Sequence, residues 1–235
     1  FKTIILNYDV TRSLLEKIDN NTTFIYFSSS EIYGNPDQLN IPTKETYNGY
    51  VSSIGDRSCY DESKRLGETI CYLFKNNENK KVKIIRPFNY YGDYMRQNDN
   101  RIIPKFMSQA MNNEDITIFG NGEQTRAYCY IDDAINMIKN ICLEGKHFVY
   151  KVGKMDEEIS AKILAEKVLK TVPNSKSKLI KIDYPNEYPK DEPMRRCPDT
   201  SNLKNEFRYK PSVNIDVGLR FFYDYAKKNF LKKKI

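Results

Sequence analysis

The stretch TFIYFSSSEIYG, residues 23–34, gives the clearest indication of how this 235-residue chain folds. Residues 23–28 form a short apolar run of the kind seen in buried strands of parallel sheets. In a doubly wound sheet, side chains that follow such a strand emerge at the carboxyl edge, where ligands bind. Three serines and a glutamate stand at this point: Ser28, Ser29, Ser30 and Glu31. The stretch therefore predicts a parallel strand that leads into a polar site.

Helical and strand-like patterns alternate around this stretch. Apolar residues recur at helical spacing over 1–19 and 60–75, and VKIIR at 82–86 predicts a second buried strand. Further helices are expected at 103–111, 131–142, 158–171, 200–207 and 215–231, and further strands at 116–119, 147–151 and 178–182. This order predicts an α/β fold with a doubly wound parallel sheet and a smaller mixed α/β lobe.

The character of the chain changes after Pro87. We therefore expect residues 1–88 to belong to the sheet domain and residues 89–235 mainly to the smaller lobe. Some segments beyond the boundary, such as 116–142, can return to the sheet domain.

Composition argues against nucleic acid and membrane as partners. Lys plus Arg number 38 against 31 Asp plus Glu, but much of the +7 excess lies in lysines near the carboxyl end, without aromatic stacking platforms. A solvated tail explains this charge better than a nucleic-acid site. No run of about 18 apolar residues is present, and charges interrupt residues 1–19, so neither membrane insertion nor secretion is expected.

The cysteines and the single histidine narrow the chemistry further. The five cysteines are odd in number and lack C-x-x-C spacing, which favours reduced thiols in a cytoplasmic protein over disulfides or a zinc site. His147 is the one candidate histidine base, and it lies in the strand-like HFVYKV. We interpret His147 as an ordinary strand residue, so no metal site and no histidine-based mechanism is predicted.

Tyr60 and Lys64, in CYDESKR, form the pair best suited to catalysis. A four-residue spacing on a helix puts phenol and ammonium on the same face, one turn apart. A free tyrosine, with a pKa of about 10, is a poor base at pH 7, and a nearby ammonium favours the phenolate. The spacing alone is common in a chain rich in Tyr and Lys. The serine cluster after the preceding strand strengthens the catalytic interpretation of this pair, because a hydroxyl there can donate a hydrogen bond to the oxygen that the tyrosine deprotonates.

With these motifs the chain resembles the extended short-chain dehydrogenase/reductase family, and within it the UDP-glucuronate decarboxylases. The resemblance is carried by SSSEIYGNP, GDRSCYDESKRLGETICY, RPFNYYGDYM followed by NDNRIIPKF, ITIFGNGEQTRAYCYIDD, and RRCPD, in the family's order. It implies a Rossmann-like NAD domain and a lobe that binds a nucleotide sugar.

The resemblance also implies roles for single residues. It makes Tyr60 the base and Lys64 its partner, and it puts Ser29 where the decarboxylases have Thr. The implied catalytic residues are Tyr60, Lys64, Ser29, Ser30, Glu31 and Arg196; the implied NAD contacts are Asn7, Tyr60, Lys64 and Tyr90; the implied substrate contacts are Asn89, Arg101, Phe119, Arg126 and Arg196. The arginines suit phosphate oxygens, and Phe119 matches an aromatic residue near the nucleotide base.

The implied reaction begins with hydride transfer from C4 of UDP-glucuronate to NAD, while Tyr60 takes the proton of the 4-hydroxyl. The 4-keto group then lies beta to the C6 carboxylate, so carbon dioxide can leave, and return of the hydride gives UDP-xylose. Dehydratase relatives carry an Asp-Glu pair where this chain has Ser30 and Glu31, which disfavours 4,6-dehydration. A nucleotide-sugar 4-epimerase or 4,6-dehydratase of the same family and a non-catalytic sugar-nucleotide-binding or dimerisation fragment remain alternatives.

One family feature is missing from the sequence. A glycine-rich cofactor loop should follow the first strand and open a helix. The G-x-G at Gly120 and Gly122 is followed by EQTR, and we interpret these residues as turn glycines. The resemblance suggests that the chain starts where the family has its fourth helix, so we expect the phosphate-binding half of the NAD site to be absent.

Three explanations of the missing loop stay open: a truncated chain, a protein completed by another chain, and a degenerate relative. We favour truncation, because the residues that match the family's site are intact. The resemblance further implies a homodimer, since helices 2–19 and 61–76 match those that form a four-helix interface in relatives.

Overall fold

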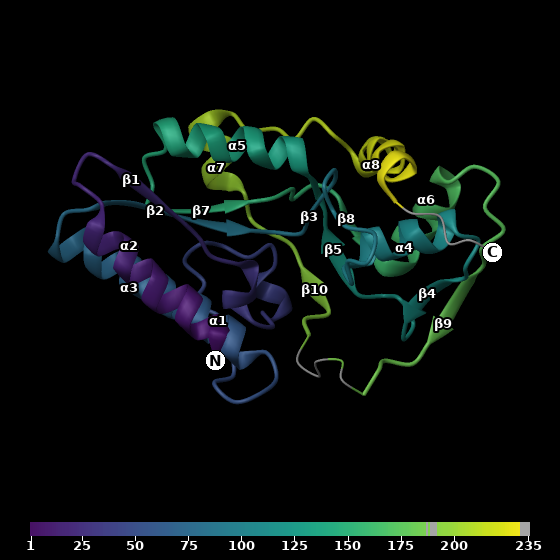
Figure 1. The fold of residues 1–235 in the computed structure, drawn as a ribbon, viewed down its shortest axis with the longest axis horizontal. Helices are drawn as coiled ribbons and strands as arrows, with labels where there is room; N and C mark the ends of the chain where they lie inside the picture. The colour runs from purple at the N-terminus through teal and green to yellow at the C-terminus, as the bar shows by residue number, and fades with distance from the viewer. Residues whose placement is uncertain (187, 189–191, 231–235) are drawn as a thin grey trace.

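A parallel three-stranded sheet organises the amino-terminal part of the chain (Figure 1). The computed structural model describes residues 1–186, 188 and 192–230. The strands are β1 (Thr23–Phe27), β2 (Lys81–Pro87) and β7 (Val149–Val152), in the order β1-β2-β7. Both pairings are parallel, with Tyr26 opposite Ile84 and Ile85 opposite Tyr150. The Rossmann-like α/β fold expected from the apolar runs is therefore confirmed.

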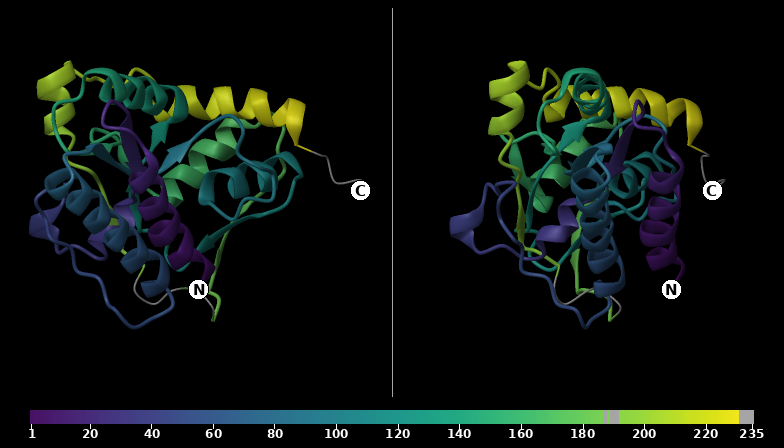
Figure 2. Two further views of the ribbon diagram at one scale, coloured as in Figure 1. Left: turned by 60° about the vertical axis from the view of Figure 1, so that its left-hand side comes forward. Right: turned by 90° about the vertical axis from the view of Figure 1, so that its left-hand side faces the viewer.

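Two helical segments cover one face of this sheet. The chain begins with α1 (Lys2–Ile5), a π-helical turn (Leu6–Val10) and α2 (Thr11–Lys17), which run beside α3 (Ser58–Asn77) in both views (Figures 1 and 2). Leu15, Phe74, Tyr26 and Ile84 form one buried cluster between these helices and the strands. The predicted helix over residues 1–19 is thus helical, but the π turn interrupts its α-helical hydrogen bonding.

The opposite face of the sheet is covered by α5 (Ile131–Glu144) and α7 (Ser201–Phe207). Ile85, next to Ile84 on β2, packs there with Met137 of α5, Tyr150 of β7 and Leu203 of α7. Successive strand residues point to opposite faces, so β2 contributes to both cores. α5 and α7 lie beyond residue 88 in the sequence, and the domain boundary at that residue stays a prediction.

Most of the remaining elements surround a further core (Figure 1). They are β3 (Tyr90–Tyr91), α4 (Ile102–Met111), β4 (Ile116–Phe119), β5 (Thr125–Ala127), β6 (Cys129–Tyr130), β8 (Glu158–Ser160), α6 (Ala161–Thr171), β9 (Leu179–Ile182), β10 (Arg195–Arg196) and α8 (Ile215–Asn229). The strands among them form a β10-β5-β8 sheet and two-stranded β3-β6 and β4-β9 ladders. Met107, Leu164 and Phe222, from α4, α6 and α8, lie buried at the centre.

Two sequence-based boundaries are wrong. The helix expected at 158–171 begins at Ala161, because residues 158–160 pair antiparallel with β5 and the Ser160 side chain accepts the N–H of Ile163 as a helix cap. The strand expected at 147–151 begins at Val149, so His147 precedes β7. The Nε2 atom of His147 lies 3.5 Å from a carboxylate oxygen of Glu206 on α7. The last residue of the helix expected at 215–231 lies outside the described residues.

The glycine and membrane predictions can also be compared with the structure. Gly120 and Gly122 have φ of 59° and 75° in the turn after β4, which confirms them as turn glycines. None of the helices in the described ranges is long and apolar enough to span a bilayer. The cytoplasmic location stays a prediction.

Gly67 allows α3 to approach its neighbours. A Cβ at this position would lie 2.0 Å from Tyr26 Oη and 3.0 Å from the carbonyl oxygen of Asn7. We predict that Gly67→Ala lowers the free energy of unfolding by about 1 kcal/mol or more, because overpacking a tight contact costs about 1–3 kcal/mol and outweighs the helix-propensity gain of about 1 kcal/mol. Urea unfolding measures this change.

The matched control is Thr69→Ala, on the exposed side of the same helix. It gains helix propensity without a clash, so its stability should equal or slightly exceed that of the wild type. A Gly67→Ala variant as stable as Thr69→Ala would contradict the packing argument.

Candidate active site

Tyr60 and Lys64 lie one turn apart at the amino-terminal end of α3. The Lys64 Nζ lies 6.0 Å from the centroid of the Tyr60 ring and donates a hydrogen bond of 2.8 Å to the carbonyl oxygen of Phe27. Burial lowers the pKa of Lys64. Phe27 ends β1, so this bond ties the tyrosine helix to the strand edge that precedes the serine cluster.

The serines after β1 are largely buried. Ser29 caps a 3-10 turn, and its Oγ accepts the N–H of Glu31 at 3.2 Å; its hydroxyl proton thus stays available to a further acceptor. Ser30 is buried within this turn. The Oγ of Ser28 is buried and has no hydrogen-bond partner among the described residues. A buried hydroxyl of this kind is suited to a ligand oxygen.

Asn7 reaches the same region from the π-helical turn. Its Nδ2 donates to Ser63 Oγ at 2.9 Å, and the Ser63 hydroxyl donates to the carbonyl oxygen of Tyr60 at 2.8 Å. Asn7 therefore connects the first helical segment to the turn that carries Tyr60. A direct contact between Asn7 and a cofactor stays a prediction.

Glu31 stands at the centre of an ion-pair cluster. The guanidinium of Arg196 donates to both of its carboxylate oxygens, at 2.5 and 2.8 Å. Arg57 also pairs with Glu31, and it is the N-cap residue of α3, three residues before Tyr60. The cluster thus joins the end of β1, the start of α3 and β10 of the second sheet.

Glu192 extends this cluster toward β5. One of its oxygens accepts from Arg126 at 2.8 Å and the other from Arg57 at 2.7 Å. Burial favours a higher pKa for Glu192, but the guanidiniums of Arg196, Arg126 and Arg57 outweigh it and hold the pKa below its usual value. Burial lowers the pKa of Arg196, although Glu31 opposes this effect.

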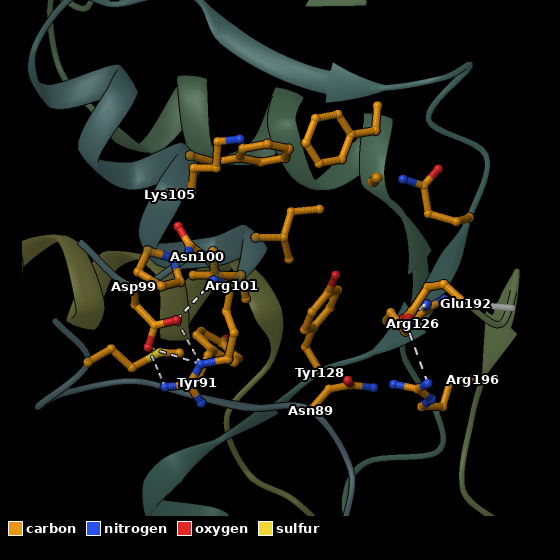
Figure 3. Close-up of a pocket in the computed structure, with 18 of the residues that line it drawn as sticks. Asn89, Tyr91, Asp99, Asn100, Arg101, Lys105, Arg126, Tyr128, Glu192 and Arg196 are labelled. Carbon is orange, nitrogen blue, oxygen red and sulfur yellow. Dashed lines mark hydrogen bonds and ion pairs between the residues drawn. The ribbon is translucent and has the colours of Figure 1, made fainter. Parts of the chain in front are cut away.

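A cavity of about 620 Å³ opens beside the cluster (Figure 3). Its volume lies in the range of small-molecule sites, about 300–1,000 Å³. The predicted residues that line it are Glu31, Asn89, Tyr90, Arg101, Phe119, Arg126 and Arg196. Seven of the residues assigned by resemblance therefore meet in one cavity.

One wall of the cavity is aromatic. The Phe119 ring packs against Tyr188, with centroids 5.5 Å apart, and Lys105 Nζ lies 4.7 Å from the Phe119 centroid. Arg101 lies on another wall, paired with Asp99 at 2.5 Å (Figure 3). Asn89, with a φ of 43°, donates from Nδ2 to the carbonyl oxygen of Ala127.

The remaining predicted residues do not line this cavity. Asn7, Ser29, Ser30, Tyr60 and Lys64 lie outside it, connected to it through Glu31 and Arg57. Tyr90 lines the cavity, but its hydroxyl is buried, and burial raises its pKa well above the usual value. We infer that Tyr90 contributes the face of its ring rather than its hydroxyl.

Sequence reasoning missed several residues of the site. Arg57 lies in the quoted segment GDRSCYDESKR, but no spacing rule connects it to Glu31, 26 residues earlier. Glu192 lies in the proline-rich stretch 185–198, 66 residues from Arg126. Asp99, Lys105 and Tyr188 also line the cavity. Among the described residues, no cluster of three His, Cys, Asp or Glu side chains could hold a metal ion.

A buried lysine supports the segment that carries Arg196. Lys151, on β7, is fully buried; its Nζ donates to the carbonyl oxygen of Thr43 and lies 3.3 Å from Glu45. The N–H of Thr43 donates to the carbonyl oxygen of Cys197 at 2.9 Å. Burial lowers the pKa of Lys151 to about 8, although Glu45 partly opposes this.

The chain matches known nucleotide-sugar enzymes in sequence. A family model described as "NAD dependent epimerase/dehydratase family" matches residues 2–153. UDP-glucuronic acid decarboxylase 1 of Xenopus tropicalis is 34% identical over 201 residues, which cover 86% of this chain and 46% of that protein. UDP-glucuronic acid decarboxylase 4 of Arabidopsis thaliana is 37% identical over 199 residues, covering 83% and 42%. The chain thus spans slightly less than half the length of these relatives.

Solved structures show the same fold. UDP-glucuronic acid 4-epimerase from Bacillus cereus, in complex with UDP-glucuronic acid and NAD, superposes with a TM-score of 0.79 at 27% identity, covering 94% of this chain and 67% of that one. dTDP-glucose 4,6-dehydratase from Bacillus anthracis, in complex with NAD, gives a TM-score of 0.82 at 21% identity, covering 97% and 69%. The second likeness concerns the fold alone.

Lys151 makes the stability of the protein depend on pH. Its folded-state pKa of about 8 lies below the ordinary lysine value of 10.5, so the unfolded state holds more protons between these values and stability rises with pH across that window. We predict that Lys151→Met removes this rise. Between pH 7 and pH 10, the free energy of unfolding of the wild type should rise by about 2 kcal/mol more than that of the variant, as measured by urea unfolding.

Lys139→Met, an exposed lysine on α5, serves as the control and should keep the wild-type pH profile. Parallel profiles for wild type and Lys151→Met would show that Lys151 does not release its proton on folding.

Proposed function

Because the chain belongs to the NAD-dependent epimerase/dehydratase family, we propose that it carries the catalytic residues and the nucleotide-sugar site of a UDP-glucuronate decarboxylase, which forms UDP-xylose through a 4-keto intermediate. The observation that carries the proposal is the double ion pair of Glu31 with Arg196, joined through Arg57 to the turn of Tyr60. The identity of 34–37% to proteins named as such decarboxylases favours this member of the family.

The shape and chemistry of the cavity support a nucleotide sugar as substrate. Phe119 offers an aromatic face for a base, and Arg126, farther along, offers guanidinium N–H groups to a diphosphate. Glu31 and Arg196 lie toward the Tyr60 helix, where the sugar would reach. Small-molecule sites combine apolar and aromatic side chains with a few placed polar groups, and this cavity offers both.

The residues present fit the nicotinamide end of NAD. The Lys64 ammonium and the unpartnered Ser28 hydroxyl stand at the carboxyl edge of β1, and Tyr90 offers a ring face nearby. Asn7 supports this end through Ser63. The glycine-rich loop for the pyrophosphate of NAD is not in this sequence, so we expect the chain by itself to bind NAD weakly.

In the proposed mechanism, NAD supplies the acceptor for the C4 hydride and returns that hydride at the end. Tyr60 takes the proton of the 4-hydroxyl, and the Lys64 ammonium, one turn away, stabilises the resulting phenolate. The Ser29 hydroxyl, whose Oγ already accepts the Glu31 N–H, can donate to the same sugar oxygen. These three groups hold and move one proton at O4.

The residue at position 30 separates decarboxylation from dehydration. Ser30 is buried in the turn before Glu31 and offers no carboxylate for expelling water from C6. Loss of carbon dioxide needs no acid at C6, because the electrons of the breaking C5–C6 bond pass into the 4-keto group. Solvent then supplies the proton that C5 gains, and Tyr60 returns the O4 proton when the hydride comes back.

Tyr60→Phe tests this assignment in the complete gene product. Removing the phenol should lower kcat by about 10²-fold or more, the usual contribution of a general base, while UDP binding stays unchanged. The assay measures carbon dioxide and UDP-xylose formed from UDP-glucuronate and NAD. Tyr72→Phe, an exposed tyrosine on the same helix, is the matched control and should be fully active.

Each alternative gives a different result in this assay. A sugar product that retains C6 would replace decarboxylation by epimerisation or dehydration. UDP binding without any change of the sugar would favour a non-catalytic binding module. Full activity of Tyr60→Phe would remove Tyr60 from the proposed role.

We also propose a homodimer formed through helices 2–19 and 61–76. Leu6, Val10 and Leu14 are exposed on the first helical segment, and Leu66 and Leu73 on α3, with exposed fractions between 39% and 63%. Adjacent helices with exposed leucine and valine side chains favour a helix-to-helix interface.

Leu14→Glu should convert a wild-type dimer to a monomer, because it places a charge within this apolar surface. Lys17→Glu, at an exposed position of the same helix, should leave the dimer intact. Sedimentation velocity distinguishes the two states. A monomeric wild type, or a dimeric Leu14→Glu variant, would contradict this interface.

A further inference from the structure

We propose that Glu192 is an internal anion that occupies the diphosphate position of the cavity, so that a nucleotide diphosphate binds by displacing it from Arg126. Glu192 would then set the affinity of the site for anions. The inference deepens the proposed function and rests on it, because it takes the diphosphate of a nucleotide as the ligand.

The contacts of Glu192 resemble those expected of a phosphate group. Its two oxygens engage different guanidiniums, with Arg126 Nη2 at 2.8 Å and Arg57 Nη1 at 2.7 Å. Arg196 Nη2 lies 3.7 Å from the oxygen that Arg126 contacts. Figure 3 shows Glu192, Arg126 and Arg196 together on one wall of the cavity, opposite Arg101. An incoming diphosphate would meet guanidiniums already paired with a carboxylate.

Among the residues that the structure describes, the charges of the cluster are balanced. Arg57, Arg126 and Arg196 face three carboxylates, since Asp61 also lies 3.6 Å from Arg57 beside Glu31 and Glu192. A diphosphate that entered a balanced cluster would gain little net attraction. Displacing Glu192 toward solvent leaves a positive excess, and in a partly buried site such an excess acts strongly on an anion.

Arg126 does not depend on Glu192 for its position. Its guanidinium also donates to the carbonyl oxygens of Thr125 at 2.8 Å and Pro193 at 2.7 Å. Arg57 and Arg196 are likewise held by Glu31. The guanidiniums therefore keep their positions when the carboxylate leaves. A change in anion binding by a Glu192 variant then reports competition between Glu192 and the ligand, and not a loss of support for the arginines.

The test is Glu192→Gln, which keeps the size of the side chain and removes its charge. Titration calorimetry of the chain with UDP and with inorganic pyrophosphate should show binding about tenfold tighter than in the wild type. The salt dependence should also be steeper, because more unpaired positive charge faces the anion. Glu123→Gln, an exposed carboxylate of the turn after β4, should bind as the wild type does.

A second variant keeps the test valid if Glu192→Gln fails to fold. Glu192→Asp retains the charge but draws it back by one methylene, so pyrophosphate should bind a few-fold tighter than to the wild type. Unchanged or weaker binding of anions by the folded variants would overturn the proposal, because it would mean that Glu192 supports the arginines or has no effect.

The outcomes also separate this inference from the proposed function. If wild type binds UDP and Glu192→Gln binds it no more tightly, displacement of Glu192 is wrong and the nucleotide site stands. If no variant binds UDP but Glu192→Gln binds pyrophosphate more tightly, the internal anion stands and the nucleotide-sugar function is wrong.

Discussion

The double ion pair between Glu31 and Arg196 is the interaction on which the geometry of the site depends. Glu31 follows β1, Arg196 lies on β10, and Arg57 adds the start of α3 to the same carboxylate. Burying these charges is costly, and only close, two-pronged geometry compensates for the lost hydration. Any movement of one segment would leave a buried charge without its partner. The ion pair therefore restrains the strand edge, the tyrosine helix and the second sheet together.

The backbone around this ion pair is fixed by independent bonds. Lys64 donates to the last carbonyl group of β1, so α3 and the serine turn keep their register. On the other side, Lys151 holds Thr43, and Thr43 pairs with the chain next to Arg196. Each bond ends on a carbonyl oxygen rather than on a mobile side chain. The side chains of the cluster are thus placed by two segments that are themselves anchored to the parallel sheet, which favours preorganisation.

Local patterns in the sequence predicted the parts of the fold that repeat at a fixed period. The apolar runs of β1 and β2 predicted the parallel sheet. The spacing of Tyr60 and Lys64 predicted that both side chains lie on the same face of the long helix α3. Two-residue strands such as β10 have no period to detect. Glu192 reaches Arg57 across 135 residues, and only the folded chain reveals such a pair. The family resemblance assigned arginines to a diphosphate, but it did not reveal that a carboxylate pairs with them.

The structure also separates the two ligands expected from the family. The residues proposed for the nucleotide sugar, from Asn89 to Arg196, all line one cavity of this chain. The residues proposed for NAD lie on the π-helical turn, at the start of α3 and on β3, and the sequence offers no glycine-rich loop beside them. In the proposed function, the charges that would hold the nucleotide part of the substrate therefore lie within this chain. Affinity for NAD needs backbone N–H groups at a glycine-rich helix start, which side chains at the nicotinamide end cannot replace.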